Sequence, residues 1–301
     1  MNKPVRIAFA LIVLCGCGDG PEIGNKPDSS TVGPVTQGTS KAAPHSSAES
    51  SNSTDRASNP DALSPALTAF LDRFDELSAR GFVPTLRSGS TGIGYTLETM
   101  LDIEENNSPG GDFLGMELKA YRDDDLRMDD SEKMNLFLKE PAWIDGLKHS
   151  DRVKQYGYVD DNGRQALYST VQIKQNSHGF AFRVAQNEDR VYMQFNNEDI
   201  AFWTFEILAT RLNEKHSEAV FVAAHSRGEG KQEEFHYYAV TWCREPSVDV
   251  FVKLIESGDV MLELRMHVKP NGSVRNHGSA FRIKQNRIPK LYATTLQVRP
   301  K

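Results

Sequence analysis

The first strong pattern in the chain predicts a helix. In residues 91–103, TGIGYTLETMLDI, the apolar residues Ile93, Leu97 and Leu101 recur at every fourth position. This spacing is typical of the buried stripe of an α-helix. Glu98 follows the stripe at its margin, so its carboxylate can reach a site beside a neighbouring sheet.

The next pattern, residues 116–120 (MELKA), predicts a strand. Side chains in a strand alternate between two faces, so Glu117 and Lys119 share one face and the three apolar residues share the other. Asp112 lies just upstream, past the turn signal of residues 109–111 (PGG), where a β-hairpin would bring it back toward Glu117. The pattern therefore predicts two carboxylates and an ammonium group at one strand end.

A second helix is predicted over residues 202–215, FWTFEILATRLNEK. Its apolar residues fall on one stripe and its charged residues on the opposite face. We expect the buried stripe to contain Phe202, Phe205, Leu208 and Leu212, and the solvated face to contain Glu206, Arg211 and Lys215.

A short motif, HGxAFR, occurs twice, at residues 178–183 and 277–282. In both copies the alternation places Ala and Arg on one strand face and Phe on the other. The simpler interpretation is two similar strands of one sheet. The sharper one concerns the second copy, where Arg275, His277 and Arg282 offer hydrogen-bond donors suited to base edges in a major groove.

The N-terminus has the pattern of an export signal. Residues 1–17 combine Lys3 and Arg6 with an apolar run and with small residues around two cysteines. This is typical of a signal peptide that is too short to remain as a membrane span. Residues 14–17 resemble a bacterial lipobox, so lipidated Cys17 is the expected membrane anchor and the cell envelope the expected location. The alternative is a mis-assigned N-terminus and a cytoplasmic protein.

Composition divides the rest of the chain into a linker and one domain. Residues 18–64 are rich in Ser, Pro and Gly and hold few large apolar side chains, so they cannot offset the entropy of ordering and predict a disordered linker. Residues 65–301 suit one medium-sized domain. Cys243 is the only cysteine outside the signal-like segment, which excludes a disulfide within the domain.

Charge narrows the choice of partners. The formal net charge of −6 argues against a protein that coats DNA without regard to sequence. Residues 261–301 are nevertheless basic, with Glu263 as their single acid, whereas residues 123–132 are mostly acidic. This polarity fits a DNA cleft with one basic wall; the alternative is a basic tail that is merely solvated.

The acids and the lysine suggest metal chemistry. Asp112 and Glu117 are suitable ligands for a hard divalent cation such as Mg²⁺, and Lys119 lies beside the water that such a cation activates. A charged edge strand with an incidental ion pair is the plainer explanation. For Arg122 we consider two roles equally, phosphate binding and a structural ion pair with the acidic residues 123–125.

The same segment resembles the MvaI/BcnI family of type II restriction endonucleases, relatives of MutH in the PD-(D/E)xK nuclease superfamily. The resemblance rests on a TGIG-x-TLE helix that contains Glu98, on Asn106-Asn107, and on a D-x4-E-L-K-A-x-R run from Asp112 to Arg122. Further similarity, which extends the resemblance to about residues 65–301, lies in residues 156–168, a helix at Ala201–Trp203, residues 233–239 and residues 265–283.

This resemblance implies a fold, an activity and a set of site residues. The implied fold is an α/β, restriction-endonuclease-like one with a mixed central sheet flanked by helices. The implied activity is Mg²⁺-dependent hydrolysis of double-stranded DNA at a short specific sequence, by a monomer that nicks one strand at a time. The implied catalytic residues are Glu98, Asp112, Glu117 and Lys119; the metal ligands are Asp112, Glu117 and the Leu118 carbonyl; the DNA-binding residues are Arg122, His267, Arg275, His277 and Arg282.

Two other functions compete with this one. A MutH-like repair nickase would depend on a partner, whereas a restriction-type enzyme is expected to need no obligatory protein partner. A non-catalytic DNA-binding lipoprotein of the envelope would have no use for Lys119 beside two metal-binding carboxylates. The intact acid and lysine set therefore favours an enzyme.

Overall fold

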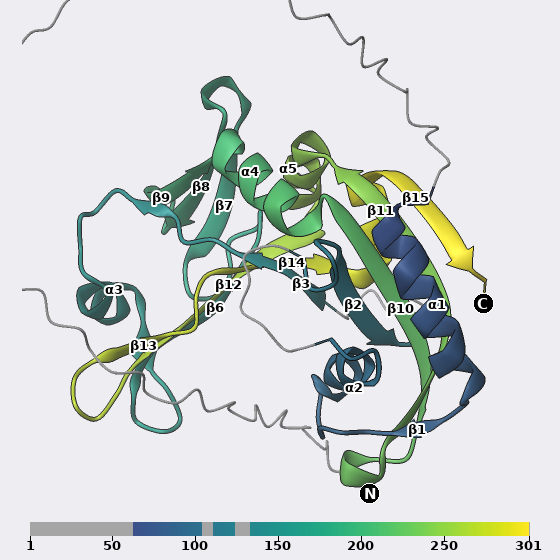
Figure 1. Ribbon diagram of the computed structural model, residues 1–301. Helices are drawn as coiled ribbons and strands as arrows, with labels where there is room; N and C mark the ends of the chain where they lie inside the picture. Colours follow the sequence, from purple (N-terminus) through teal and green to yellow (C-terminus); the bar gives the residue numbers. More distant parts are fainter. Residues whose placement is uncertain (1–62, 104–110, 124–132, 301) are drawn as a thin grey trace, which may run out of the picture. The chain divides into compact units, whose positions relative to one another are not determined.

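Three β-sheets and five α-helices make up the part of the chain that the computed structural model describes, residues 63–103, 111–123 and 133–300 (Figure 1). The signal-like segment, the linker up to residue 62, and Asn106-Asn107 lie outside these residues. No helix in the described ranges has the length and apolar character needed to cross a membrane.

The first sheet is mixed, as expected. Its strands run in the order β1, β11, β10, β2, and β15 pairs with residues 240–246 of β11. Only the pairing between β2 and β10 is parallel; the others are antiparallel. The strand bounds are Val83–Pro84 (β1), Glu117–Arg122 (β2), Glu218–Arg227 (β10), Glu234–Pro246 (β11) and Tyr292–Arg299 (β15).

Two further sheets, which the sequence pattern did not separate, are antiparallel. One contains β3 (Lys133–Leu138), β14 (Ala280–Lys284), β12 (Val260–Val268), β6 (Gln165–Val171) and β5 (Tyr158–Val159), with β13 (Val274–Asn276) paired to β12. The other contains β4 (Ala142–Trp143), β9 (Glu198–Thr204), β8 (Arg190–Phe195) and β7 (Phe180–Ala185).

Helix starts follow ordinary capping chemistry. The backbone N–H of Leu67 donates to the side chain of Ser64 at 3.0 Å, and Pro follows in the first turn. Thr204 and Ser247 cap their helices in the same way. The helices are α1 (Pro65–Ala79), α2 (Gly92–Met100), α3 (His149–Tyr156), α4 (Phe205–His216) and α5 (Val248–Glu256), and three short 3-10 helices are Gln186–Glu188, Gly230–Gln232 and Gln285–Leu291.

The two faces of the mixed sheet pack against different partners. In β10, Val220 and Val222 belong to the core beneath α1 and α2, whereas Phe221 and Ala223 belong to a second, larger core. Figure 1 shows α1 lying along β10 and β11, and α2 beside β2. Because β10 is buried on both faces, it is a firm support for the strand next to it, β2.

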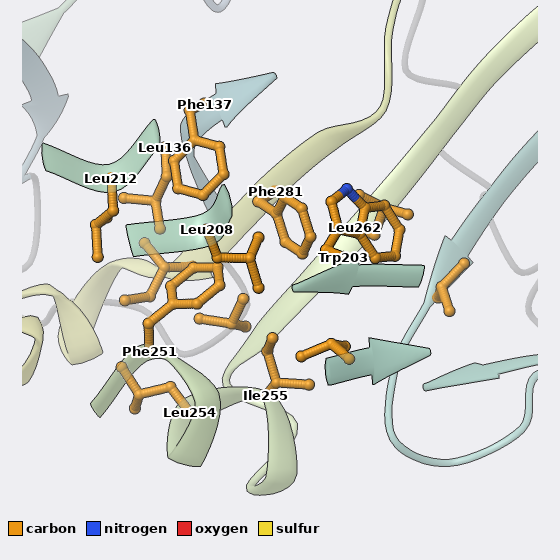
Figure 2. Close-up of a cluster of buried hydrophobic side chains, with 14 of the residues drawn as sticks. Leu136, Phe137, Trp203, Leu208, Leu212, Phe251, Leu254, Ile255, Leu262 and Phe281 are labelled. Atoms are coloured by element: carbon orange, nitrogen blue, oxygen red, sulfur yellow. The ribbon is translucent and has the colours of Figure 1, made fainter. Parts of the chain in front are cut away.

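The larger core joins all three sheets through α4 and α5. Figure 2 shows Leu208 of α4 and Phe251 of α5 packed with Trp203 of β9 and Phe281 of β14. The ring centroids of Phe281 lie 5.1 Å from Trp203 and 5.5 Å from Phe251. Such aromatic pairs contribute about 0.5–1.5 kcal/mol each beyond the area they bury.

The second predicted helix begins later than expected. Residues 201–203, assigned to a helix on the family resemblance, lie in strand β9, and the helix starts at Phe205. The physical reason is the N-cap at Thr204, whose side chain accepts a hydrogen bond from the N–H of Ile207 at 3.2 Å. Phe202 is accordingly half-buried on the strand and contacts Arg190, rather than lying on a helical stripe.

The two copies of the HGxAFR motif lie in different sheets, so the interpretation as two strands of one sheet was wrong. The first copy forms β7 and the second β14. Their equivalent phenylalanines, Phe182 and Phe281, stack on each other with 6.2 Å between ring centroids. The repeated motif therefore places its two equivalent phenylalanines in contact at the interface of the two sheets.

His216 fixes the end of α4. Its Nε2 lies 2.9 Å from the Leu136 carbonyl oxygen, and because a carbonyl can only accept, Nε2 carries the proton. Its Nδ1 then accepts from the Tyr292 hydroxyl at 3.0 Å. Complete burial, reinforced by the charges of Lys119 and Lys215 and opposed by the bond to Leu136, lowers the pKa of His216 to about 3.

We therefore predict an acid-sensitive contribution to stability. Between pH 6.5 and 3 the unfolded chain binds a proton at residue 216 that the folded chain does not, so the free energy of unfolding falls on acidification. The slope is up to about 1.4 kcal/mol per pH unit and vanishes below the folded pKa. Urea unfolding between pH 7 and 5 measures it. His216→Gln should lose this slope and exposed His149→Gln should keep it; equal slopes in both variants would contradict the assignment.

Candidate active site

Strand β2 carries the predicted acid and lysine on one face. Leu118 packs on the opposite side, in the core beneath α1 and α2. Glu117 is completely buried, and the side chain of Lys119 is about one quarter exposed. The Lys119 ammonium forms an ion pair with Glu117 Oε1. The predicted alternation is confirmed, and the polar face turns out to be covered as well.

A tight turn brings Asp112 to the same strand. Residues 113–116 close on themselves through two backbone hydrogen bonds of 2.9 Å, with Gly115 in the left-handed region at φ 87°. Gly111 lies so close to this turn that a Cβ would be 2.4 Å from the Gly115 carbonyl oxygen. Asp112 Oδ2 then accepts from the N–H of Leu118 at 3.2 Å. The return of Asp112 to β2 is confirmed, and the turn that produces it lies downstream of Asp112.

Lys215 is the site residue that the sequence prediction missed. We expected it on the solvated face of its helix, which was wrong: its side chain is only 16% exposed. Its Nζ lies 2.7 Å from Glu117 Oε2 and 3.3 Å from Asp112 Oδ1. The signal was present in the spacing, because Lys215 continues the buried stripe of Leu208 and Leu212 by a further three residues.

Burial and charge act in opposite directions on this cluster. Burial raises the pKa of Glu117, and the Asp112 charge adds to this, while Lys119 and Lys215 oppose it. Burial acts to lower the pKa of Lys215, but the hydrogen bond and charge of Glu117, together with Asp112, outweigh it and raise that pKa. Two ammonium groups thus neutralise two carboxylates.

The acid pair has the donor chemistry of a divalent cation site. Both oxygens of Glu117 are buried, and each faces an ammonium group: Oε1 faces Lys119 and Oε2 faces Lys215. Within the described ranges no group of three or more His, Cys, Asp and Glu side chains could hold a metal ion. A cation between Asp112 and Glu117 would therefore need the Leu118 carbonyl, water or substrate oxygens to complete its ligands.

A groove of about 600 Å³ runs beside this cluster, between α2 and the strands β2, β3 and β14. Glu98 lines it together with Lys119, so the helix does bring its carboxylate to the sheet. Glu98, Asp112 and Glu117 do not form a group of three carboxylates placed to hold one metal ion. The cationic side chains along the groove are Arg87, Lys119, Arg122, Lys133 and Arg282.

Arg122 is held by an acid other than the ones considered. Its guanidinium donates to both carboxylate oxygens of Glu233, at 2.6 and 3.0 Å, and to the Gly89 carbonyl at 3.2 Å. It also lies over the ring of Phe235. Arg122 thus ties the end of β2 to the loop before α2, which forms one wall of the groove.

Three of the four residues predicted to read bases lie together. His267 pairs with Arg275 across β12 and β13, and the rings of His267 and His277 are 6.3 Å apart. His267 Nδ1 lies 2.7 Å from the Tyr168 hydroxyl. Burial, followed by nearby arginines, lowers the pKa of both histidines. This favours neutral imidazoles.

The fourth, Arg282, stands apart from them. It donates to Glu263 at 2.6 Å and to the Lys133 carbonyl oxygen, and it lines the groove with Lys119. Arg282 therefore lies beside the groove and not with His267, Arg275 and His277, the other residues predicted to read bases.

The fold and the acid and lysine cluster define a restriction-endonuclease class of protein. The solved complex of restriction endonuclease MvaI with its cognate DNA substrate is similar to this chain, with a TM-score of 0.66 and 23% identity over 78% of this chain and 99% of that chain. Restriction endonuclease MvaI in the absence of DNA has a TM-score of 0.49 and 23% identity over 79% of this chain and 99% of that chain. The family model of the MvaI/BcnI restriction endonucleases matches residues 71–292, and the chain belongs to this family of type II restriction-like deoxyribonucleases. No curated protein matches the chain.

The pairing of Arg122 with Glu233 predicts a measurable coupling. Their side chains are 25% and 11% exposed, so a double-mutant cycle with Arg122→Ala and Glu233→Ala should give about 1–3 kcal/mol of coupling in urea unfolding. Arg227 and Glu234 form a more exposed pair of the same length and should couple by about 0–1 kcal/mol. Equal coupling in both cycles would contradict a structural role for Arg122.

Proposed function

We propose that this protein is a Mg²⁺-dependent, sequence-specific endonuclease that hydrolyses phosphodiester bonds in double-stranded DNA. The observation that carries the proposal is the convergence of Asp112, Glu117 and Lys119 on one strand beside a groove lined by cationic side chains. Membership of a restriction endonuclease family supports it. So does the fold shared with MvaI, which was solved with its cognate DNA.

Each residue of the site has a defined task in this proposal. Asp112, Glu117 and the Leu118 carbonyl would hold Mg²⁺. When bound, the ion would polarise the scissile phosphate and lower the pKa of a bound water. Lys119 would orient a water beside the scissile phosphate and stabilise the negative charge that develops on the phosphate. Glu98 supplies a further carboxylate from the opposite wall of the groove.

Recognition is assigned to a separate group of side chains. His267, Arg275 and His277 would contact base edges, because their ring and guanidinium groups offer donors of the kind that read a major groove. Arg282 and Arg122 would contact the backbone near the cleavage site. One Asp, Glu and Lys cluster lies in the described residues, so we propose that the protein acts as a monomer that nicks one strand and must bind again to cut the other.

A cleavage assay tests this function. We expect the purified full chain to cut unmethylated phage DNA into discrete fragments in the presence of Mg²⁺. Lys119→Ala should lower the rate by about 10²-fold or more while DNA binding persists, because the lysine acts on the transition state. Lys253→Ala, an exposed lysine in the last turn of α5, is the matched control.

The pattern of products separates the alternatives. Nicked plasmid that appears before linear plasmid would support sequential nicking. Smeared products would contradict sequence specificity. Intact but retarded DNA would contradict an autonomous nuclease and favour a partner-dependent nickase or a binding protein, and equal loss of binding and cleavage in Lys119→Ala would contradict its assigned role.

We also propose that the enzyme is exported and anchored through Cys17. The basis is the signal-like sequence of residues 1–17 and the linker that follows it. Fractionation of native cells with labelling for acylated protein should place a processed, lipid-modified form in the envelope, and Cys17→Ser should abolish the label. Finding only the full-length, unprocessed protein in the cytosol would contradict export.

A further inference from the structure

Lys215 occupies the space between the two carboxylates of the site. Its Nζ contacts Glu117 Oε2 at 2.7 Å and Asp112 Oδ1 at 3.3 Å, whereas Lys119 pairs with Glu117 alone. A Mg²⁺ ion held by Asp112 and Glu117 would need carboxylate oxygens of the kind that Lys215 now contacts. An ammonium group and a divalent cation cannot both occupy this position between the two carboxylates, because they would fill the same space and their charges repel.

The backbone of Lys215 is fixed, so only its side chain can move away. The next residue, His216, is fully buried and bonded to Leu136 and Tyr292, which anchors the last turn of α4. The flexible four-carbon stem of a lysine can nevertheless swing its ammonium group through several ångströms. The side chain can thus leave the carboxylates without unfolding the helix.

The charges of the cluster hold the ammonium group of Lys215 between the two carboxylates. Asp112 and Glu117 carry two negative charges, and Lys119 and Lys215 carry two positive ones. Without Lys215, the largely buried acid pair would keep only Lys119 as a counter-charge, and an unpaired buried carboxylate is costly. A divalent cation therefore has to displace the Lys215 ammonium group, which already neutralises the carboxylates.

We infer that the ammonium group of Lys215 occupies the position of the metal cation in the DNA-free enzyme and leaves this position when DNA binds. Tight metal binding therefore requires bound DNA. This inference rests on the proposed function, in which Asp112 and Glu117 hold the cation. A phosphate oxygen of bound DNA, close to the same cation, is the new partner that the displaced ammonium group would find. Lys215 thereby links two binding events through one side chain.

Metal binding to the DNA-free full chain tests the inference without any cleavage. Mn²⁺ accepts the same oxygen ligands as Mg²⁺ and is measured directly by electron paramagnetic resonance. Lys215→Gln and Lys215→Met remove the competing charge and should bind Mn²⁺ about tenfold more tightly or better than the wild type. Lys253→Gln, in the last turn of α5, should leave the affinity unchanged. Unchanged or weaker binding in both Lys215 variants would overturn the inference.

Glu117→Ala distinguishes this failure from failure of the proposed function. If Glu117→Ala abolishes Mn²⁺ binding while the Lys215 variants bind no more tightly, only the role of Lys215 is wrong. If Glu117→Ala leaves Mn²⁺ binding intact, the cation lies elsewhere and the proposed site itself is wrong. Thermal unfolding with and without Mn²⁺ covers variants of low stability, because a tighter site should raise their melting temperature more than that of the wild type.

DNA binding provides the reciprocal test. By linkage, a cation and DNA that help each other to bind do so by the same factor in both directions. Gel retardation of phage DNA fragments with and without Ca²⁺ should therefore show a larger gain in DNA affinity for the wild type and Lys253→Gln than for Lys215→Gln. An equal gain in all three proteins would overturn the coupling.

Discussion

The site depends on one buried carboxylate, that of Glu117, and on the two lysines that neutralise it. A charge removed from water costs several kcal/mol unless it is paired, so Glu117 can be buried only where two chain segments each deliver an ammonium group. Lys119 comes from the same strand and Lys215 from the end of α4. This requirement fixes the end of α4 against the edge strand β2, and it makes the site a property of the assembled fold.

The surrounding structure supplies the rigidity that such a cluster needs. Strand β2 pairs in parallel with β10, which is buried on both faces. The end of α4 is held by His216, and the turn before β2 is closed by its own backbone hydrogen bonds. Groups placed on strands and helix ends keep their geometry better than groups on loops. Glu117, which we propose as a metal ligand, therefore has little freedom, whereas the stem of Lys215 is flexible.

The residues proposed for chemistry and those proposed for DNA recognition occupy different parts of the fold. The acids lie on the mixed sheet, whereas His267, Arg275 and His277 lie around β12 and β13 of a separate antiparallel sheet. The two regions are joined through the larger core, in which Phe281 of β14 contacts Phe182 of β7 and residues of α5. Arg282, the next residue along β14, lines the groove beside Lys119. A single strand thus runs from the shared core to the groove.

The sequence by itself determined the local features of this protein: the helix that carries Glu98, the alternation that places Glu117 and Lys119 on one face, and the family. Short-range periodicity encodes these features, because they depend on neighbours a few residues apart. Only the tertiary structure decided which groups meet across long separations. Lys215, nearly one hundred residues beyond Glu117, reaches the site because α4 packs against β3 and β11. Arg122 meets Glu233 because β10, the strand that pairs with β2, turns back there into β11. Such pairings depend on burial and on the need to neutralise buried charge. A pattern of neighbouring residues in the sequence does not predict them.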